Sequence, residues 1–201
     1  MHVSERGLSI IKEFEGYMKA LPNGDCMAYR CYVAPGVHDG KWTIGWGCTE
    51  GITEGLVWTR TQAEEGLKRE ITRFEDAVTR LVKFVPNQNQ FDALVSLAYN
   101  IGEGGLSKSS VLRLANLGDM AGAARSFSLW NKSQSIVVGG LVRRRAKEAV
   151  LFMELAPGEE VSGQELTNIF GPNDMYSSWI TKGMSGIWNS YVAQVPSMIG
   201  A

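Results

Sequence analysis

Apolar side chains recur at helical spacing through most of the chain. Between Thr59 and Leu81 they follow one another at steps of three or four, which is typical of a helix with one buried face. Thr59 and Gln62 match the pattern of a capping box, so we expect a long helix to begin there. The opposite face is charged, and we expect it to be solvated: Glu64, Lys68, Arg69, Arg73, Glu75 and Arg80.

The same periodicity predicts helices before and after this one. Residues 4–15 form the first, with Ser4 as its N-cap and Gly16 as its stop. The apolar stretch 89–101 leaves little polar face, so we expect a buried helix. Further helices are predicted over residues 107–117, from Asp119 to about Trp130, and over 141–153, with a polar loop at 131–140.

Residues 28–47 depart from the helical pattern and predict a β-hairpin. Its strands are 29–33 and 41–45, separated by turn-forming residues. If the hairpin is symmetric about residue 37, Cys31 lies opposite Thr43 and shares its face. The run Gly45-Trp46-Gly47 places two glycines where a strand rarely has them, which indicates the wall of a cleft approached closely by another group.

Glu15 is the first candidate for chemistry. It continues the apolar stripe of Leu8 and Ile11 into the last turn of the first helix, whereas Glu13 points away. Partial burial and the helix dipole both favour a protonated carboxyl group there, and such a group can act as a general acid. A solvated glutamate at a helix end is the alternative interpretation.

Three consecutive arginines open the last predicted helix. Because Arg143, Arg144 and Arg145 point around the helix, they cannot form a single patch. The sequence leaves open surface ion pairing, a structural salt bridge with Glu15, and substrate binding.

Composition narrows the class of protein. With 201 residues, 44% of them hydrophobic and 20% charged, the chain resembles an ordinary globular protein. The net charge of -1 provides no general surface for nucleic acid, and no apolar run is long enough for a membrane span. We see no secretory signal. Three cysteines argue against a disulfide framework, and neither a CxxC pair nor a histidine pair supports a zinc site.

Five motifs occur in order along residues 4–154: Phe14-Glu15-Gly16, Ala28-Tyr29-Arg30-Cys31, Trp42 to Gly47, Gln90 to Gly102, and Gly140 to Glu148. Each motif alone is weak, but the ordered set is specific. Together they resemble the phage-type lysozymes, the endolysins of glycoside hydrolase family 24.

The resemblance implies an α+β, mostly helical, two-lobed lysozyme-like fold. We expect a catalytic domain over residues 1–154, with a β-hairpin lobe at about 17–58 and a helical lobe at about 59–154 that begins with the long connecting helix. Beyond the region of resemblance, apolar residues of the tail keep helical spacing, so we expect residues 155–201 to be a helical C-terminal extension packed on the catalytic domain. A segment that contacts the membrane interface or the cell wall is the alternative. The implied reaction is hydrolysis of the β-1,4 bond between N-acetylmuramic acid and N-acetylglucosamine in peptidoglycan, which lyses the bacterial host for phage release.

The family's site consists of a glutamate at the end of the first helix, an aspartate or cysteine on the first strand, and a threonine on the second. Glu15, Cys31 and Thr43 match these positions. The path from Glu15 to Thr43 is longer than is usual in the family, so Asp39 is a second choice for the middle position and Asp25 a third.

The resemblance also implies partners and location. The substrate is the glycan strand of peptidoglycan, no cofactor or metal is needed, and a separate holin lets a monomeric enzyme pass from the host cytoplasm to the wall in the periplasm. Some relatives with an N-terminal membrane anchor are held inactive by a disulfide. Such a switch involving Cys26, Cys31 or Cys48 stays open here, although we see no anchor.

Two other functions fit the same residues. A lytic transglycosylase would also use Glu15, but it would release a 1,6-anhydro product. A non-catalytic wall-binding protein could retain the fold, although the presence of both Glu15 and Thr43 favours an enzyme.

Overall fold

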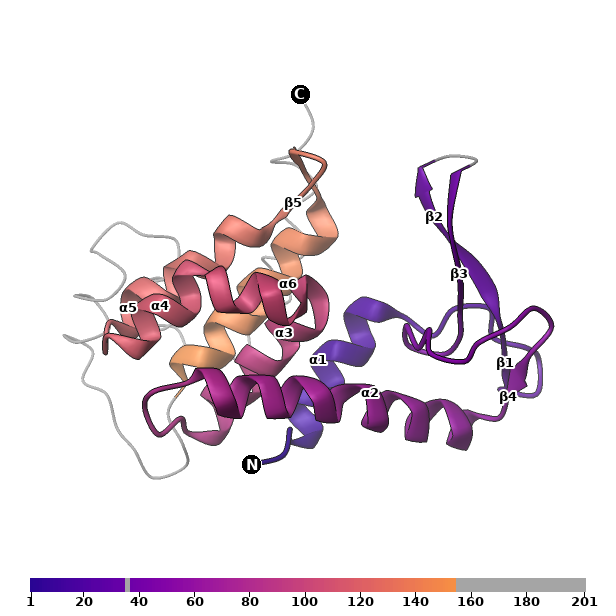
Figure 1. The fold of residues 1–201 in the computed structure, drawn as a ribbon, viewed down its shortest axis with the longest axis horizontal. Helices are drawn as coiled ribbons and strands as arrows, with labels where there is room; N and C mark the ends of the chain where they lie inside the picture. The colour runs from indigo at the N-terminus through magenta and orange to yellow at the C-terminus, as the bar shows by residue number, and fades with distance from the viewer. Residues whose placement is uncertain (35–36, 155–201) are drawn as a thin grey trace, which may run out of the picture.

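A computed structural model describes residues 1–34 and 37–154, without the side chains of residues 31–39. The sheets β1–β4 and β2–β3 lie at one end of the long helix α2 (Arg60–Leu81), whereas helices α3 to α6 and the short β5–β6 hairpin lie toward its other end, which confirms the predicted fold (Figure 1). The predicted extension over 155–201 lies outside the described residues. The elements are α1 Glu5–Glu15, β1 Cys26–Met27, β2 Tyr29–Ala34, β3 Val37–Thr43, β4 Val57–Trp58, α2 Arg60–Leu81, α3 Gln88–Lys108, α4 Ser110–Asn116, α5 Met120–Ser126, η1 Phe127–Trp130, β5 Lys132–Ser133, β6 Ile136–Val137 and α6 Gly139–Met153.

Helix α1 has the predicted ends. The side chain of Ser4 accepts a hydrogen bond from the backbone N–H of Gly7, and the backbone N–H of Ser4 donates to Asp92 of α3 at 2.9 Å. Asp92 is fully buried and also accepts from the Ser4 hydroxyl, so the start of α1 is fixed to the helical lobe. At the other end Gly16 has a φ of +70°, a conformation that favours glycine, and it leaves Glu15 as the last helical residue.

Helix α2 connects the two lobes. It begins with the predicted capping box of Thr59 and Gln62, and its 22 residues correspond to a length of about 33 Å. The predicted apolar stripe is buried, but Glu75 contradicts the expectation of a uniformly solvated charged face. Its carboxylate accepts a hydrogen bond from the backbone N–H of Val3 at 2.7 Å and contacts His2. The N-terminal segment, which the periodicity of α2 does not reveal, therefore covers Glu75.

The register of the β2–β3 hairpin corrects the sequence prediction. Tyr29, and not Cys31, is paired with Thr43, and Arg30 is paired with Trp42. Farther out the register shifts twice, because the two strands contribute unequal numbers of residues between successive pairs. A symmetric hairpin about residue 37 was therefore the wrong assumption. Strand β3 also ends at Thr43 instead of continuing to residue 45.

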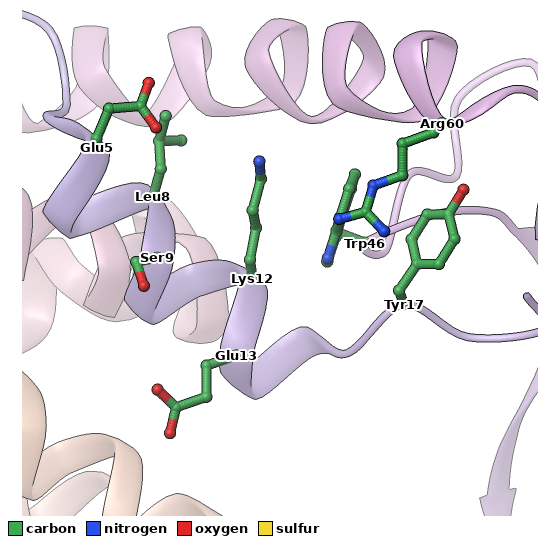
Figure 2. A pocket seen from close by; sticks show the side chains of 8 residues that line it. All are labelled: Glu5, Leu8, Ser9, Lys12, Glu13, Tyr17, Trp46 and Arg60. Carbon is green, nitrogen blue, oxygen red and sulfur yellow. The ribbon is translucent and has the colours of Figure 1, made fainter. Parts of the chain in front are cut away.

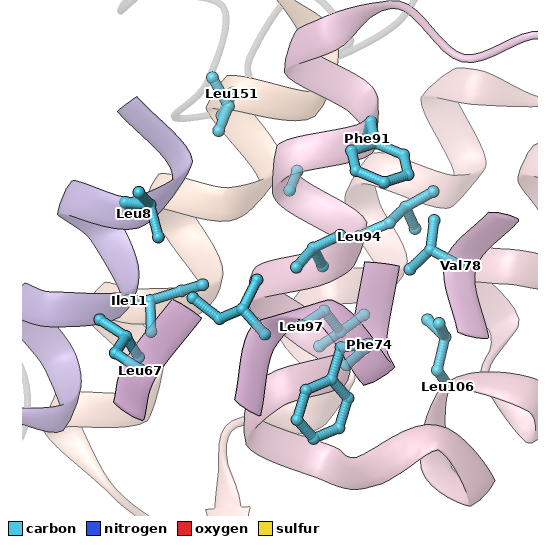
Figure 3. Close-up of a cluster of buried hydrophobic side chains, with 14 of the residues drawn as sticks. Leu8, Ile11, Leu67, Phe74, Val78, Phe91, Leu94, Leu97, Leu106 and Leu151 are labelled. Carbon is cyan, nitrogen blue, oxygen red and sulfur yellow. The ribbon is translucent and has the colours of Figure 1, made fainter. Parts of the chain in front are cut away.

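Helix α3 forms the centre of the helical lobe and packs against α1, α2, α4 and α6. Its buried character was predicted, but its length was not, because helical structure resumes after Gly102, whose φ is +78°. The predicted helix over 107–117 consequently begins only at Ser110. Figure 3 shows the apolar core around α3, which includes Leu8, Ile11, Leu67, Phe74, Val78, Phe91, Leu94, Leu97, Leu106 and Leu151.

The predicted polar loop at 131–140 contains a short hairpin formed by β5 and β6. Its two turn residues, Gln134 and Ser135, both have positive φ. Because glycine or asparagine usually occupies such positions, the sequence here did not indicate a two-residue hairpin turn. Within the part of the chain that the structure describes, no helix combines the length and the apolar character needed to cross a bilayer.

Replacing Gly7 by alanine tests how tightly α1 is anchored. Alanine normally stabilises a helix by about 1 kcal/mol relative to glycine. At Gly7, however, a Cβ would lie 2.8 Å from the Cβ of Asp92, so we expect Gly7→Ala to lower the free energy of unfolding by about 1–3 kcal/mol. Gly104 has open space around its Cα, so Gly104→Ala is the matched control and should stabilise the protein. Urea unfolding of both variants measures the contrast, and equal effects would contradict the tight packing at Gly7.

Candidate active site

Glu15 lies at the junction of the two lobes. Its carboxylate Oε1 accepts a hydrogen bond from Nη1 of Arg144 in α6 at 2.6 Å, and 23% of its side chain is exposed. The structure thus confirms one of the three possibilities for the arginine run, a salt bridge with Glu15. Glu13 lies on another side of α1, as predicted, and pairs with Lys147 at 2.5 Å.

Arg144 is held by a buried polar cluster. Its Nε donates to Oε1 of Glu148 at 3.1 Å, and its Nη2 donates to the backbone carbonyl of Ser96 in α3 at 3.1 Å. The hydroxyl of Ser96 donates to the same Glu148 oxygen at 2.6 Å, and Arg145 pairs with Glu148 through its Nε at 2.7 Å. Burial raises the pKa of the Glu148 carboxyl and lowers that of the Arg145 guanidinium, while the attraction between the opposite charges acts against both shifts.

The Gly45-Trp46-Gly47 run forms a tight turn and not the predicted strand. Ile44 and Cys48 close it with two backbone hydrogen bonds of 2.9 and 3.1 Å, and both glycines have positive φ. A Cβ at Gly47 would lie 3.7 Å from Oε2 of Glu15. The Tyr99 hydroxyl would lie 3.6 Å from the same Cβ, so two groups adjoin the backbone at Gly47 at ordinary contact distance. The predicted close approach is found at Gly45, where a Cβ would lie 3.1 Å from the Cβ of Ala63.

Tyr99 of α3 fixes this turn beside Glu15. Its hydroxyl donates to the carbonyl of Trp46 at 2.9 Å. Burial, followed by the negative charge of Glu15, raises the pKa of the Tyr99 phenol, so the hydroxyl keeps its proton and remains a donor. Tyr99 lies within the motif from Gln90 to Gly102, but its apolar neighbours in the sequence predicted only a buried core residue.

The Trp46 side chain of this turn contacts two cations and an aromatic ring. The buried ring of Trp46 lies 4.7 Å from the ring of Tyr17, with Lys12 at 4.9 Å and Arg60 at 5.1 Å from its centroid. Cation–π contacts of this kind stabilise the packing of α1, the turn and α2. They border a pocket of about 420 Å³ along the exposed side of α1, lined by Glu5, Leu8, Ser9, Lys12, Glu13, Tyr17, Trp46 and Arg60 (Figure 2). Glu15 does not line this pocket.

The remaining candidate residues are placed as follows. Thr43 is buried at the end of β3, directly before the turn that approaches Glu15. Asp25 is half-buried in the loop before β1, where it accepts a hydrogen bond from the side chain of Asn23 at 2.7 Å. The side chains of Cys31 and Asp39 lie outside the described part of the chain.

Cys26 and Cys48 are buried free thiols, so they are not joined to each other. Burial raises the pKa of the Cys48 thiol to about 11. No group of three or more metal-binding side chains is present among the residues with described positions.

Comparison with known proteins finds matches over most of the described chain. Residues 12–148 match the phage lysozyme family. The endolysin of Acyrthosiphon pisum secondary endosymbiont phage 1 is 35% identical over 156 residues, which cover 76% of this chain and 98% of that protein. The endolysin of Bacillus phage PZA is 39% identical over 162 residues, covering 78% of this chain but only 57% of the relative, so the chain spans just over half of that protein's length.

Solved structures agree with the sequence matches. The muramidase domain of SpmX from Asticaccaulis excentricus has a TM-score of 0.68 and 34% identity, with coverage of 77% of this chain and 100% of that domain. An endolysin from Escherichia coli O157:H7 phage FAHEc1 has a TM-score of 0.66 and 33% identity, covering 77% and 94% of the two chains.

The raised pKa of the Cys48 thiol predicts that this cysteine reacts slowly in the folded protein. At pH 8 a thiol with a pKa near 11 is ionised to only about 0.1%, compared with about a quarter for an unperturbed cysteine, and the thiolate is the reactive form. In a variant with Cys26→Ser and Cys31→Ser, we therefore expect Ellman's reagent to label folded protein on the order of 100-fold more slowly than protein unfolded in urea. The rate for the folded protein should rise as the pH increases from 8 to 10. Equal rates in the folded and unfolded states would contradict the burial of this thiol.

Proposed function

Because the chain belongs to the phage lysozyme family, we propose that Glu15 is the proton donor with which it hydrolyses the glycan strands of peptidoglycan. The chain is a glycoside hydrolase of the lysozyme type. It cleaves the β-1,4 bond between N-acetylmuramic acid and N-acetylglucosamine and so lyses the host cell. The observation that carries the proposal is the partly exposed Glu15 carboxylate at the lobe junction, held by Arg144.

The proposed reaction begins with proton transfer from Glu15 to the glycosidic oxygen of the leaving sugar. Bond cleavage then passes through an oxocarbenium-like transition state. The ion pair with Arg144 fixes the direction of the Glu15 carboxyl group, and Gly47 keeps the space beside it free of a side chain. Both features support orientation of the acid toward a bound strand.

Thr43 and a residue at the middle position complete the proposed site. Thr43 adjoins the turn that contacts Glu15, which supports a role in positioning the attacking water. Cys31 is the first choice for the middle position, where a thiolate would stabilise the positive charge of the transition state. Asp39 is the second choice and Asp25 the third, and the hydrogen bond of Asp25 to Asn23 gives that carboxylate a separate structural role.

We extend the proposal to the organisation and partners of the protein. Residues 1–154 form the catalytic domain, which agrees with the family match over 12–148, and residues 155–201 form an appended extension. The enzyme works as a monomer on glycan strands. A separate holin brings it from the host cytoplasm to the periplasmic face of the wall.

The comparisons do not favour the two alternative functions. The relatives reported above carry the names endolysin and muramidase, which supports hydrolysis over transglycosylation and over wall binding without catalysis. Mass spectrometry of digested peptidoglycan separates the two reactions, because hydrolysis leaves a reducing end whereas transglycosylation leaves a 1,6-anhydro ring.

Replacing Glu15 by glutamine should abolish lysis without unfolding the protein. Glutamine keeps the shape of the side chain but cannot supply the proton, so we expect activity to fall by at least about 100-fold. Glu13→Gln is the matched control, because Glu13 lies in the same helical turn and pairs with the exposed side of α6 through Lys147. The turbidity of permeabilised cells measures lysis, and a Glu15→Gln variant that clears them at the normal rate would disprove the proposed role.

The middle position can be assigned by comparing conservative variants. We expect Cys31→Ser to reduce activity strongly, because a hydroxyl does not supply the negative charge of a thiolate at neutral pH. Asp39→Asn and Asp25→Asn should retain activity within a few-fold of the unmodified protein. The same turbidity assay ranks the three variants, and loss confined to one of the aspartate variants would move the assignment to that residue.

A further inference from the structure

Helix α6 contributes an unusual group of charges to the interior of the helical lobe. Arg144 and Arg145 are 2% and 1% exposed, and Glu148 is fully buried. Buried charges of this kind are costly unless they are paired and hydrogen-bonded. Of these three side chains only Arg144 forms an ion pair with Glu15, and this contact connects the buried group to the proposed proton donor.

The guanidinium of Arg144 divides its hydrogen bonds among three partners. Nη1 donates to Glu15, Nε donates to Glu148, and Nη2 donates to the carbonyl of Ser96. The hydroxyl of Ser96 also donates to Glu148 at 2.6 Å. Helix α3 therefore holds the Glu148 carboxylate in place, and this carboxylate in turn holds Arg144. Because a guanidinium is a rigid planar fork, the position of Glu148 determines where Nη1 meets Glu15.

The formal charges of the group also depend on Glu148. Two guanidiniums face two carboxylates, so the group is neutral when Glu15 is ionised. A proton donor must instead carry its proton before the reaction, and one positive charge is then uncompensated. Without Glu148 this excess would be two charges, and both would strongly favour the ionised form of Glu15.

We propose that Glu148 is a positioning residue of the glycosidase reaction: it holds Arg144 against Glu15 and offsets enough positive charge for Glu15 to carry the proton. This inference rests on the proposed role of Glu15. Arg145 accompanies Glu148 as a second buried partner without contacting Glu15 through a hydrogen bond. Within the described part of the chain, the other groups near Glu15 are Tyr99 from α3 and the backbone at Gly47. Cys48 and Glu70 act on Tyr99 through their charges.

The test compares Glu148→Gln with Glu75→Gln. Both substitutions neutralise a buried carboxylate while keeping its shape, but Glu75 lies on α2, where its partners among the described residues, His2 and Val3, belong to the N-terminal segment. The kinetics are measured on soluble glycan strands over a range of pH, and circular dichroism gives the folded fraction. For Glu148→Gln we expect kcat at neutral pH to fall about tenfold, with KM changed less than about twofold.

The pH profile separates positioning from simple structural support. In Glu148→Gln, Arg144 and Arg145 would favour ionised Glu15 more strongly, so the alkaline limb of kcat/KM should move to lower pH. Glu148→Asp keeps the charge and should recover part of both kcat and the profile. Glu75→Gln should lose stability but keep the kcat and the alkaline limb of the unmodified protein. A Glu148→Gln variant whose activity follows only its folded fraction, with an unmoved limb, would overturn the inference.

Two further variants, Ser96→Ala and Glu15→Gln, ensure that each outcome supports or overturns the inference. If Glu148→Gln does not fold, Ser96→Ala keeps all the charges but removes one hydrogen bond that holds Glu148 in place, so it should lower kcat while the alkaline limb stays where it is. A folded Ser96→Ala variant with unchanged kcat would then overturn the inference. Glu15→Gln is assayed in parallel. If it is inactive while Glu148→Gln is normal, only this inference fails; if it is active, the proposed function fails and the inference falls with it.

Discussion

The ion pair between Glu15 and Arg144 is the contact on which the arrangement of this protein depends. It joins the last residue of α1 to α6, two elements at opposite ends of the described chain. The other end of α1 is fixed to α3 through Ser4 and Asp92. The short helix is therefore held at both ends, and the carboxylate it carries has a defined position between the lobes. That position makes Glu15 suitable as a proton donor to a bound glycan.

The turn that carries Trp46 and Gly47 completes the surroundings of the carboxylate. Tyr99 holds the turn from the helical lobe, whereas Lys12 and Arg60 form cation–π contacts with the buried ring of Trp46. The turn is thus fixed by α1, α2 and α3 together. A backbone stretch without a side chain at Gly47 can then lie beside Glu15 without blocking it.

Local signals predicted the helices well, because caps and periodicity depend on neighbouring residues. Ser4, Gly16, Thr59 and Gln62 all act at helix ends as expected. The motif order identified the lysozyme-like fold and indicated Glu15 as the candidate proton donor.

The errors arose where distant residues decide the structure. The hairpin register depends on bulges that a symmetric alignment of strands cannot show, so Tyr29 replaced Cys31 as the partner of Thr43. Glu75 is buried by the N-terminal segment, which lies far from it in sequence. The choice of Arg144 as the partner of Glu15 requires the packing of α1 on α6. The spacing of Arg144 and Glu148 is compatible with an ion pair within α6. It does not indicate that this pair lies next to the Glu15 carboxylate.

The most direct test of the central claim is a crystal structure of the Glu15→Gln variant with a glycan strand of peptidoglycan bound. We predict that the side chain of residue 15 lies within hydrogen-bonding distance, about 3 Å, of the glycosidic oxygen between N-acetylmuramic acid and N-acetylglucosamine. The strand should cross the junction of the lobes beside Gly47. A strand whose scissile bond lies away from residue 15, with another carboxyl group at its glycosidic oxygen, would contradict the account.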